Sequence, residues 1–205
     1  MRAKDLMTYP VITVRPEAPA KEAARLLASH GFTALPVVDA DDTVVGIVSE
    51  ADLIRGRVLP DPRSLIDDNP PAPPEPAAAT VAGVMTANPV VVALTADAVV
   101  LTKLMLDRHL RTLPVVDEGR LTGIVTRRDL LRTIARDDQD IARDVRHRLA
   151  VAFRRPWEVE VIDGVVSLAS DSDDPEDRHI AEVIAGALPG VREVRLAEGA
   201  RPEPS

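Results

Sequence analysis

The sequence predicts a mixed α/β (α+β) fold: two related β-α-β-β-α repeats followed by a smaller α-β-β-α-β domain. The first observation is self-similarity. Leu-Pro-Val-Val-Asp at 35–39 recurs letter for letter at 113–117, and Gly-Ile-Val-Ser at 46–49 returns as Gly-Ile-Val-Thr at 123–126. The second observation is size, because one such unit buries too little apolar surface to fold alone. We therefore expect the two copies to pack on each other about a pseudo-twofold axis.

The elements of each repeat follow from its apolar pattern. A β-branched run after a proline predicts the first strand, and apolar residues at helical spacing predict the helix that follows. Leu-Pro-Val-Val-Asp opens a second strand, and a polar turn leads to its hairpin partner. The expected elements are strands at 11–14 and 90–93, helices at 20–29 and 98–108, strands beginning at 35 and 113, strands at 44–48 and 121–125, and helices beginning at 49 and 126.

The chain divides into five expected segments. Seven prolines between 60 and 76 predict an extended linker, because proline lacks an amide N–H and is excluded from helix interiors. The last 69 residues carry nine basic and sixteen acidic side chains, whereas the part before them is nearly balanced, which indicates a separate module. The expected segments are repeat one at 1–58, the linker at 59–80, repeat two at 81–136, a C-terminal domain at 137–197 and a disordered tail at 198–205.

Composition narrows the function classes. The 205 residues include no cysteine, which excludes disulfides, thiolate metal sites and cysteine nucleophiles. A net charge of −8 and only four aromatic residues argue against a nucleic-acid partner. The N-terminus lacks the apolar stretch of a signal peptide, and no run approaches the ~18 apolar residues of a membrane span. We therefore expect a cytoplasmic protein.

The candidate chemistry lies where the third strand of each repeat meets the second helix. Ser49 is followed by Asp52, and Thr126 by Asp129. One interpretation is a capping box, in which hydroxyl and carboxylate satisfy free helix N–H groups. The other is a ligand site, in which the helix N-terminus attracts phosphate and the Asp accepts ribose hydroxyls. The local pattern leaves both interpretations open, and the duplication shifts the balance toward the second.

These motifs resemble the paired CBS domain, a family named for cystathionine β-synthase. Met-Thr at 7–8 and 85–86, Leu-Pro-Val-Val-Asp and Gly-Ile-Val-Ser/Thr-x-x-Asp-Leu carry the resemblance, which covers residues 1–58 and 81–136. The resemblance implies a regulatory module that binds AMP, ADP, ATP or S-adenosylmethionine, as a regulatory ligand and not as a cofactor. It also implies clefts assembled from both copies, and a homodimer.

The resemblance implies two mirror-related clefts. In one, Thr126 and Asp129 would hold phosphate and ribose, while Thr8–Ile12 and Phe32–Ala34 line the base. In the other, Ser49 and Asp52 would act with Thr86–Val90 and Leu110–Thr112. The implied ligand-binding residues are Thr126, Arg127, Arg128, Asp129, Arg111, Thr8, Ile12, Thr33, Ala34, Ser49, Asp52, Thr86, Val90 and Thr112.

The two clefts are predicted to differ in charge. Copy two offers Arg127 and Arg128 after its Thr, with Arg111 before its second strand, and arginine pairs well with phosphate oxygens. The corresponding positions of copy one are Glu50, Ala51 and Thr33. The Thr126 cleft is therefore expected to prefer charged phosphates. A solvated helix face remains an equally good interpretation of either arginine taken singly.

The C-terminal domain resembles the BON family. An apolar stripe at 141, 145 and 149 predicts a helix, Asp-Gly at 163–164 a hairpin turn, 178–188 a helix and 191–196 a strand. The resemblance implies binding of phospholipids or hydrophobic ligands at cell envelopes. Because an acidic module is repelled by anionic membranes, an interaction module is favoured over a membrane binder.

The combined interpretation is a non-enzymatic regulator that senses an adenosine nucleotide and acts on an unknown protein target. The alternatives are a structural oligomerisation module with degenerate clefts, an envelope-associated lipid binder, and a small enzyme. The enzyme is disfavoured because neither copy offers a nucleophile with a base. No metal site is expected, since His30 and His109, near helix ends, lack companions at ligand spacing.

Overall fold

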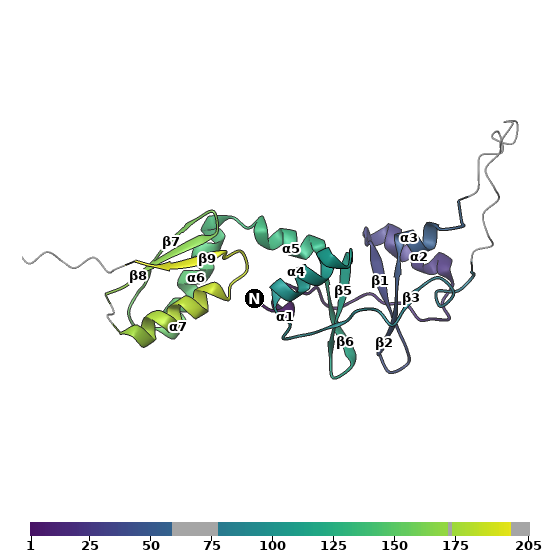
Figure 1. Cartoon of the computed structure of the whole chain (residues 1–205), viewed down its shortest axis with the longest axis horizontal. Helices are drawn as coiled ribbons and strands as arrows, with labels where there is room; N and C mark the ends of the chain where they lie inside the picture. Colours follow the sequence, from purple (N-terminus) through teal and green to yellow (C-terminus); the bar gives the residue numbers. More distant parts are fainter. Residues whose placement is uncertain (59–77, 172–173, 198–205) are drawn as a thin grey trace, which may run out of the picture. The chain divides into compact units, whose positions relative to one another are not determined.

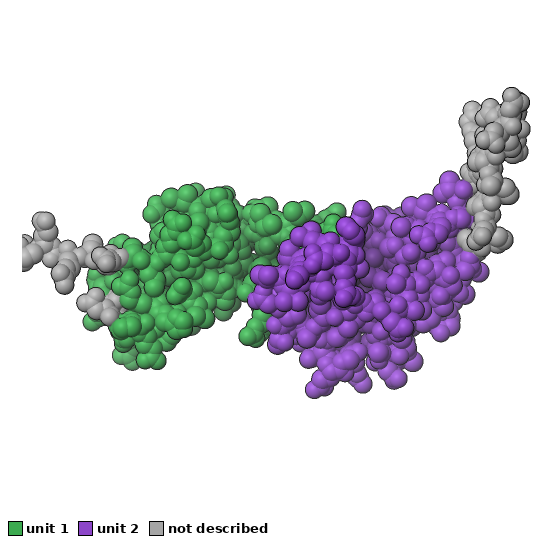
Figure 2. Space-filling view, in the orientation of Figure 1, with its two compact units in different colours: residues 1–6, 127–205 green, residues 7–126 purple. Residues whose placement is uncertain are grey.

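The computed structural model describes residues 1–58, 78–171 and 174–197, which form two compact units. Residues 7–126 make one unit, and residues 1–6 with the chain from 127 onward make the other (Figure 2). The expected linker at 59–80 lies largely outside the described residues, and the expected tail at 198–205 lies wholly outside them.

The first repeat and the opening segment of the second build a three-stranded sheet in the order β1-β2-β3 (Figure 1). The helix α2 buries Ala20, Ala23 and Leu27 and ends at Gly31, whose φ of 64° is the left-handed conformation that glycine adopts readily. The elements are α2 (Ala20–His30), β1 (Ala34–Val38), β2 (Val44–Ser49), α3 (Glu50–Ile54) and β3 (Thr86–Ala87).

The prediction of a strand at 11–14 was wrong. Only Val14 pairs, through its N–H to the Pro36 carbonyl and its carbonyl to the Val38 N–H. Prolines at 10 and 16 flank the segment, and a proline cannot donate a ladder hydrogen bond. A single bridge remains where a strand was predicted.

The second repeat has the same order of elements. The strand β4 pairs in parallel with β5, and β5 pairs antiparallel with β6. The expected strand at 90–93 is shortened to β4 (Val92–Ala93), while the helix and the hairpin match the prediction. The other elements are α4 (Ala98–Asp107), β5 (Thr112–Asp117) and β6 (Arg120–Thr126).

The two repeats exchange segments with each other. β3, which opens the second repeat, pairs with β2 of the first. Reciprocally, Thr8 forms a bridge to Ile124 in β6. The glycines opposite these segments are covered by methionines, Met85 over Gly46 and Met7 over Gly123. This reciprocity confirms that the copies pack on each other.

The second unit contains the expected α-β-β-α-β order. Its sheet has the order β7-β8-β9, and alternate apolar residues of the strands pack against α6 and α7. The hairpin turn is held by Asp138, whose carboxylate accepts from the N–H groups of Asp163 and Gly164 at 2.7 and 2.9 Å. The elements are α1 (Ala3–Leu6), α5 (Arg127–Ile134), α6 (Asp138–Ala152), β7 (Glu158–Ile162), β8 (Val165–Ala169), α7 (Pro175–Gly186) and β9 (Glu193–Leu196).

Candidate functional site: the strand–helix junctions

The first junction is a complete capping box. Ser49 ends β2 and is the N-cap of α3; its N–H and its hydroxyl donate to Asp52 Oδ2 at 2.9 and 2.6 Å. The Asp52 N–H in turn donates to Ser49 Oγ at 3.4 Å. α3 has only five residues, so its helix dipole is small. The capping interpretation therefore describes this junction, and the carboxylate that could accept a ribose already accepts two hydrogen bonds.

The second junction has the same residue types at the start of a longer helix. Thr126 is the last residue of β6, and α5 begins at Arg127 and runs for eight residues. Asp129, in the first turn of α5, is only 7% exposed, and its Oδ1 lies 3.3 Å from the guanidinium of Arg132. A buried carboxylate needs such compensation, because isolated ions are strongly disfavoured away from water.

Thr112 in β5 carries a buried hydroxyl close to the second junction. It stands directly opposite Thr126 in the β5–β6 ladder, so the two side chains share one face of the sheet. Thr112 is 6% exposed, and its Oγ1 has no hydrogen-bond partner within the described part of the chain. An unpaired buried hydroxyl costs about 1–3 kcal/mol, so a group that satisfied it would bind with that advantage.

The first repeat lacks this feature. The residue opposite Ser49 in the β1–β2 ladder is Ala34, which has no polar side-chain atom. The sequence analysis assigned Thr112 to the cleft of Ser49, whereas the ladder places it beside Thr126. Its alignment with Ala34 was visible in the repeat, but the lack of a partner was not, since that depends on every side chain packed around it.

The structure brings some of the other expected site residues close to the junctions. Thr8 exchanges backbone hydrogen bonds of 2.9 and 3.1 Å with Ile124, two residues before Thr126. Thr86 pairs with Ile47, two residues before Ser49. Each N-terminal segment therefore lies beside the third strand of the other copy.

The remaining expected residues have varied environments. The carbonyl of Thr33 accepts from the N–H of Glu50 at 3.1 Å, which ties it to the first junction. Ile12 packs against the first-repeat core, and Val90 is half-buried between β3 and β4. Arg111 and Arg128 are exposed, and Arg127 is half-buried.

Metal ligands and membrane-spanning helices are two other features that bear on function within the described ranges. No group of three or more His, Asp or Glu side chains there could hold a metal ion. Among the helices described, none combines the length and the apolar character needed to cross a membrane.

Comparison with known proteins identifies the repeats. The family model of the CBS domain matches residues 3–58 and 81–136, more than half of the chain. The chain belongs to the CBS domain family. The two matched segments are the two repeats, so residues 7–126 contain most of a CBS pair.

Relatives of the CBS pair include enzymes and free-standing pairs. The chain is 31% identical over 152 residues to inosine-5'-monophosphate dehydrogenase of Methanocaldococcus jannaschii, a match to 74% of this chain but only 27% of the relative. The crystal structure of CBSX2 in complex with AMP has a TM-score of 0.52 and 32% identity, covering 64% of this chain and 93% of that one. The CBS pair of MJ0100, in complex with 5'-methylthioadenosine and S-adenosyl-L-methionine, has a TM-score of 0.51 and 26% identity over 64% and 94% of the two chains.

Proposed function

We propose that this chain is a non-enzymatic cytoplasmic regulator whose CBS pair binds one adenosine-type ligand, namely AMP, ADP, ATP or S-adenosylmethionine. The observation that carries the proposal is the buried, unpaired hydroxyl of Thr112 opposite Thr126, next to the strand–helix junction of the second repeat. Relatives of similar fold have been crystallised with AMP and with S-adenosyl-L-methionine, which supports this ligand class.

The ligand would be held by residues close together in the chain. The N-terminus of α5 would attract phosphate through the positive end of its helix dipole, with Arg127 and Arg128 in its first turn. Asp129, whose carboxylate also contacts Arg132, would accept the ribose hydroxyls. Thr112 would give its hydroxyl to the ligand, which would satisfy a buried group that has no hydrogen-bond partner among the described residues.

The first repeat is proposed to be structural. Its helix has five residues, and Ala34 stands in place of Thr112. Glu50 would also repel a phosphate there. These observations favour the second candidate function, a degenerate cleft with a purely structural role, for this junction alone.

Two assembly features belong to the same proposal. α4 exposes Val99, Val100 and Leu106 at 75, 51 and 58%, on a helix that already buries Leu101 and Met105. We propose that a second copy of the chain covers this apolar face in a homodimer. The α-β-β-α-β module, which has the order of elements of a BON domain, is proposed to act as the contact module for a protein target.

The test is isothermal titration of the full chain with AMP, ADP, ATP and S-adenosylmethionine in turn. The expected result is a saturable isotherm with one site per chain for at least one ligand. A thermal-shift assay gives a second measurement, since a ligand at 100 times its Kd adds about 2.7 kcal/mol to the native state. Absence of binding by all four ligands in both assays contradicts the proposal and leaves the structural role.

A further inference from the structure

A groove lies between two helices of the second unit, away from the CBS repeats in sequence. It has a volume of about 340 Å³ and is lined by His147, Arg148 and Val151 of α6 and by Ile184 of α7. The two helices pack against each other (Figure 1). The groove belongs entirely to the α-β-β-α-β module, so it is independent of the proposed nucleotide site.

The apolar wall of the groove is only partly used by the protein core. On α7 Ala181 and Ala185 are fully buried, and Ile184 is half-buried and packs against the same core. Ile180 and Val183 are 40 and 57% exposed, and Val151 on α6 is 77% exposed. Together with Ile184 these four side chains form an apolar patch that water contacts in the free protein. Contiguous exposed aliphatic patches of this kind mark interaction sites.

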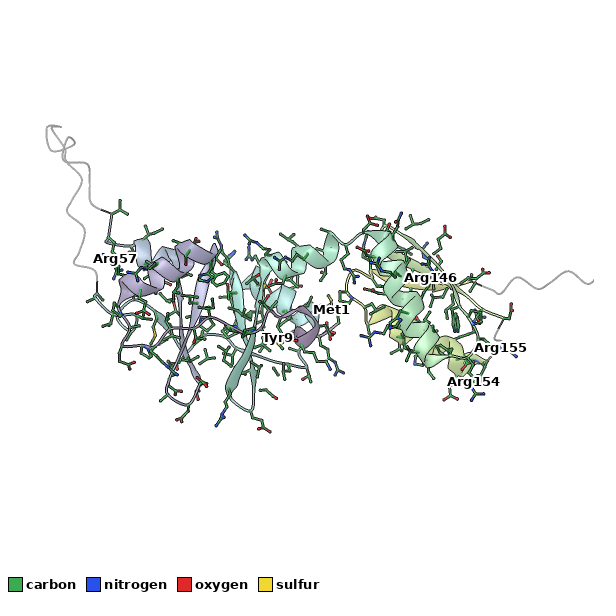
Figure 3. The ribbon with its side chains drawn as sticks, turned by 180° about the vertical axis from the view of Figure 1, so that it is seen from behind. Met1, Tyr9, Arg57, Arg146, Arg154 and Arg155 are labelled. Atoms are coloured by element: carbon green, nitrogen blue, oxygen red, sulfur yellow. The ribbon has the colours of Figure 1, made fainter. Side chains whose placement is uncertain are left out.

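The rim of the groove is cationic. His147 and Arg148 of α6 line the groove. Arg154 and Arg155 follow just beyond the C-terminal end of that helix (Figure 3). The acidic residue one turn before Arg148 is Asp144, and its carboxylate accepts a hydrogen bond from Arg136. That bond, together with nearby arginines, holds the pKa of Asp144 below its usual value, so its charge is already compensated.

We infer that this groove docks an acidic amphipathic helix of a partner protein. A third helix laid over two adjacent helices would bury the patch of Val151, Ile180, Val183 and Ile184, as in helix bundles. Carboxylates beside its apolar stripe would pair with Arg148 and His147.

The charges favour a single helix over a lipid surface. Residues 137–205 carry sixteen acidic and nine basic side chains, so a broad anionic membrane meets net repulsion. A docked helix interacts within a few ångströms of the rim, well inside the screening length of about 8 Å at physiological salt. Arg148, which lines the groove, lies within that range of a docked helix.

The experiment measures binding of two synthetic peptides to the full chain by fluorescence anisotropy. Both have about 16 residues, long enough to populate a helix, with Leu at helical i, i+4, i+7 and i+11 positions. One carries Glu beside the apolar stripe and the other carries Lys. The Glu peptide is expected to bind saturably and the Lys peptide at least about tenfold more weakly.

Three variants locate the site. Val151→Glu with Val183→Glu is expected to weaken the Glu peptide by about tenfold or more, because it places charge in the apolar patch. Arg148→Glu is expected to weaken the Glu peptide and to strengthen the Lys peptide. The matched control is Arg143→Glu, an exposed arginine of the same helix that pairs with Asp140 and does not line the groove. It is expected to change neither affinity by more than about twofold.

Several outcomes overturn the inference. These are equal binding of both peptides, no saturable binding of the Glu peptide, or binding that the apolar double variant leaves intact. Stronger binding to phosphatidylglycerol vesicles, lost in the same variants, would reassign the groove to lipid. AMP titration of each variant separates the two proposals, because a groove variant should keep the affinity of the parent chain for nucleotide.

Discussion

The thioether of Met7 occupies the space that a side chain at Gly123 would need. A Cβ built on Gly123 would overlap Met7 Sδ and come within 2.8 Å of Cγ and 3.0 Å of Cβ. Met85 has the same relation to Gly46, with its Cγ at 3.1 Å. The glycine of each Gly-Ile-Val-Ser/Thr motif is therefore a position at which a methionine of the other repeat packs against the strand.

Gly123→Ala is predicted to destabilise the protein by about 1–3 kcal/mol, because overpacking pushes Met7 away. Gly46→Ala should cost less, since the clash is mostly with the flexible end of Met85. The measurement is urea unfolding followed by circular dichroism. Met7→Ala in the Gly123→Ala background should recover part of the loss, and a strictly additive double mutant would contradict the packing account.

Thr112→Val is predicted to weaken ligand binding without destabilising the fold. Replacing an unpaired buried hydroxyl by a methyl group should leave the free energy of unfolding unchanged or raise it by about 1 kcal/mol. The same change should weaken AMP binding by about 0.5–1.5 kcal/mol, the worth of one neutral hydrogen bond. Urea unfolding and calorimetry measure the two effects.

The matched control for Thr112 is Thr122 in β6. Its hydroxyl donates to the Val115 carbonyl at 3.1 Å, so Thr122→Val should destabilise the protein while leaving AMP binding unchanged. A Thr112→Val variant that loses stability but keeps its affinity would assign that hydroxyl a structural role.

The sequence predicted the parts of this fold that depend on local pattern. The repeated Leu-Pro-Val-Val-Asp segments give the hairpins β1–β2 and β5–β6, and Ser49-x-x-Asp52 gives a true capping box. The prediction of a strand at 11–14 was wrong because the length of a strand depends on its register with the neighbouring strand and on flanking prolines. Local pattern sets which elements form, whereas pairing partners set where they end.

The properties that carry the two proposals could not be read from the sequence. Whether Thr112 finds a partner depends on side chains from several elements. On α7 the fully buried positions are Ala181 and Ala185, while Ile180 and Val183 are exposed. Small side chains let the helix lie close to the sheet, and the larger Ile180 and Val183 are left at its flank. The distance between the helix and the sheet decides which of these positions are buried. The periodicity of the sequence does not encode that distance.

The two junction aspartates are predicted to respond differently to alanine. Asp129→Ala should weaken AMP binding by about 1.5–3 kcal/mol, the range for hydrogen bonds to a charged group. Asp52→Ala should destabilise the fold by about 0.5–2 kcal/mol through loss of the capping box, with little change in affinity. Calorimetry and urea unfolding of both variants check this, and equal losses of affinity would mean that both junctions bind ligand.

The Arg136–Asp144 pair predicts a pH-dependent contribution to stability. The hydrogen bond from Arg136 lowers the pKa of Asp144 in the folded protein below its ordinary value of 3.8. The stabilisation is therefore present above that value and is lost as pH falls through the lower folded-state pKa. Its size should stay below about 1 kcal/mol, because Asp144 is 44% exposed to solvent.

Asp144→Asn tests this by urea unfolding as a function of pH. The parent chain should be the more stable one at pH 7, and the difference should shrink below about pH 4. A difference that stays constant down to acid pH would show that the carboxylate acts through something other than its charge.

Charge at the two junctions is predicted to decide which one is occupied. Copy two begins its helix with Arg127 and Arg128, whereas copy one has the exposed Glu50. The double exchange Arg127→Glu with Glu50→Arg should therefore weaken ATP more than AMP at the second junction, because repulsion grows with phosphate charge. Affinity of the parent chain for ATP should also fall with salt, as expected for an open charged site. Calorimetry at two salt concentrations measures both effects. Two equal, salt-insensitive sites in the parent chain would show that these charges do not decide which junction is occupied. Thr112 would then remain as a difference between the two junctions.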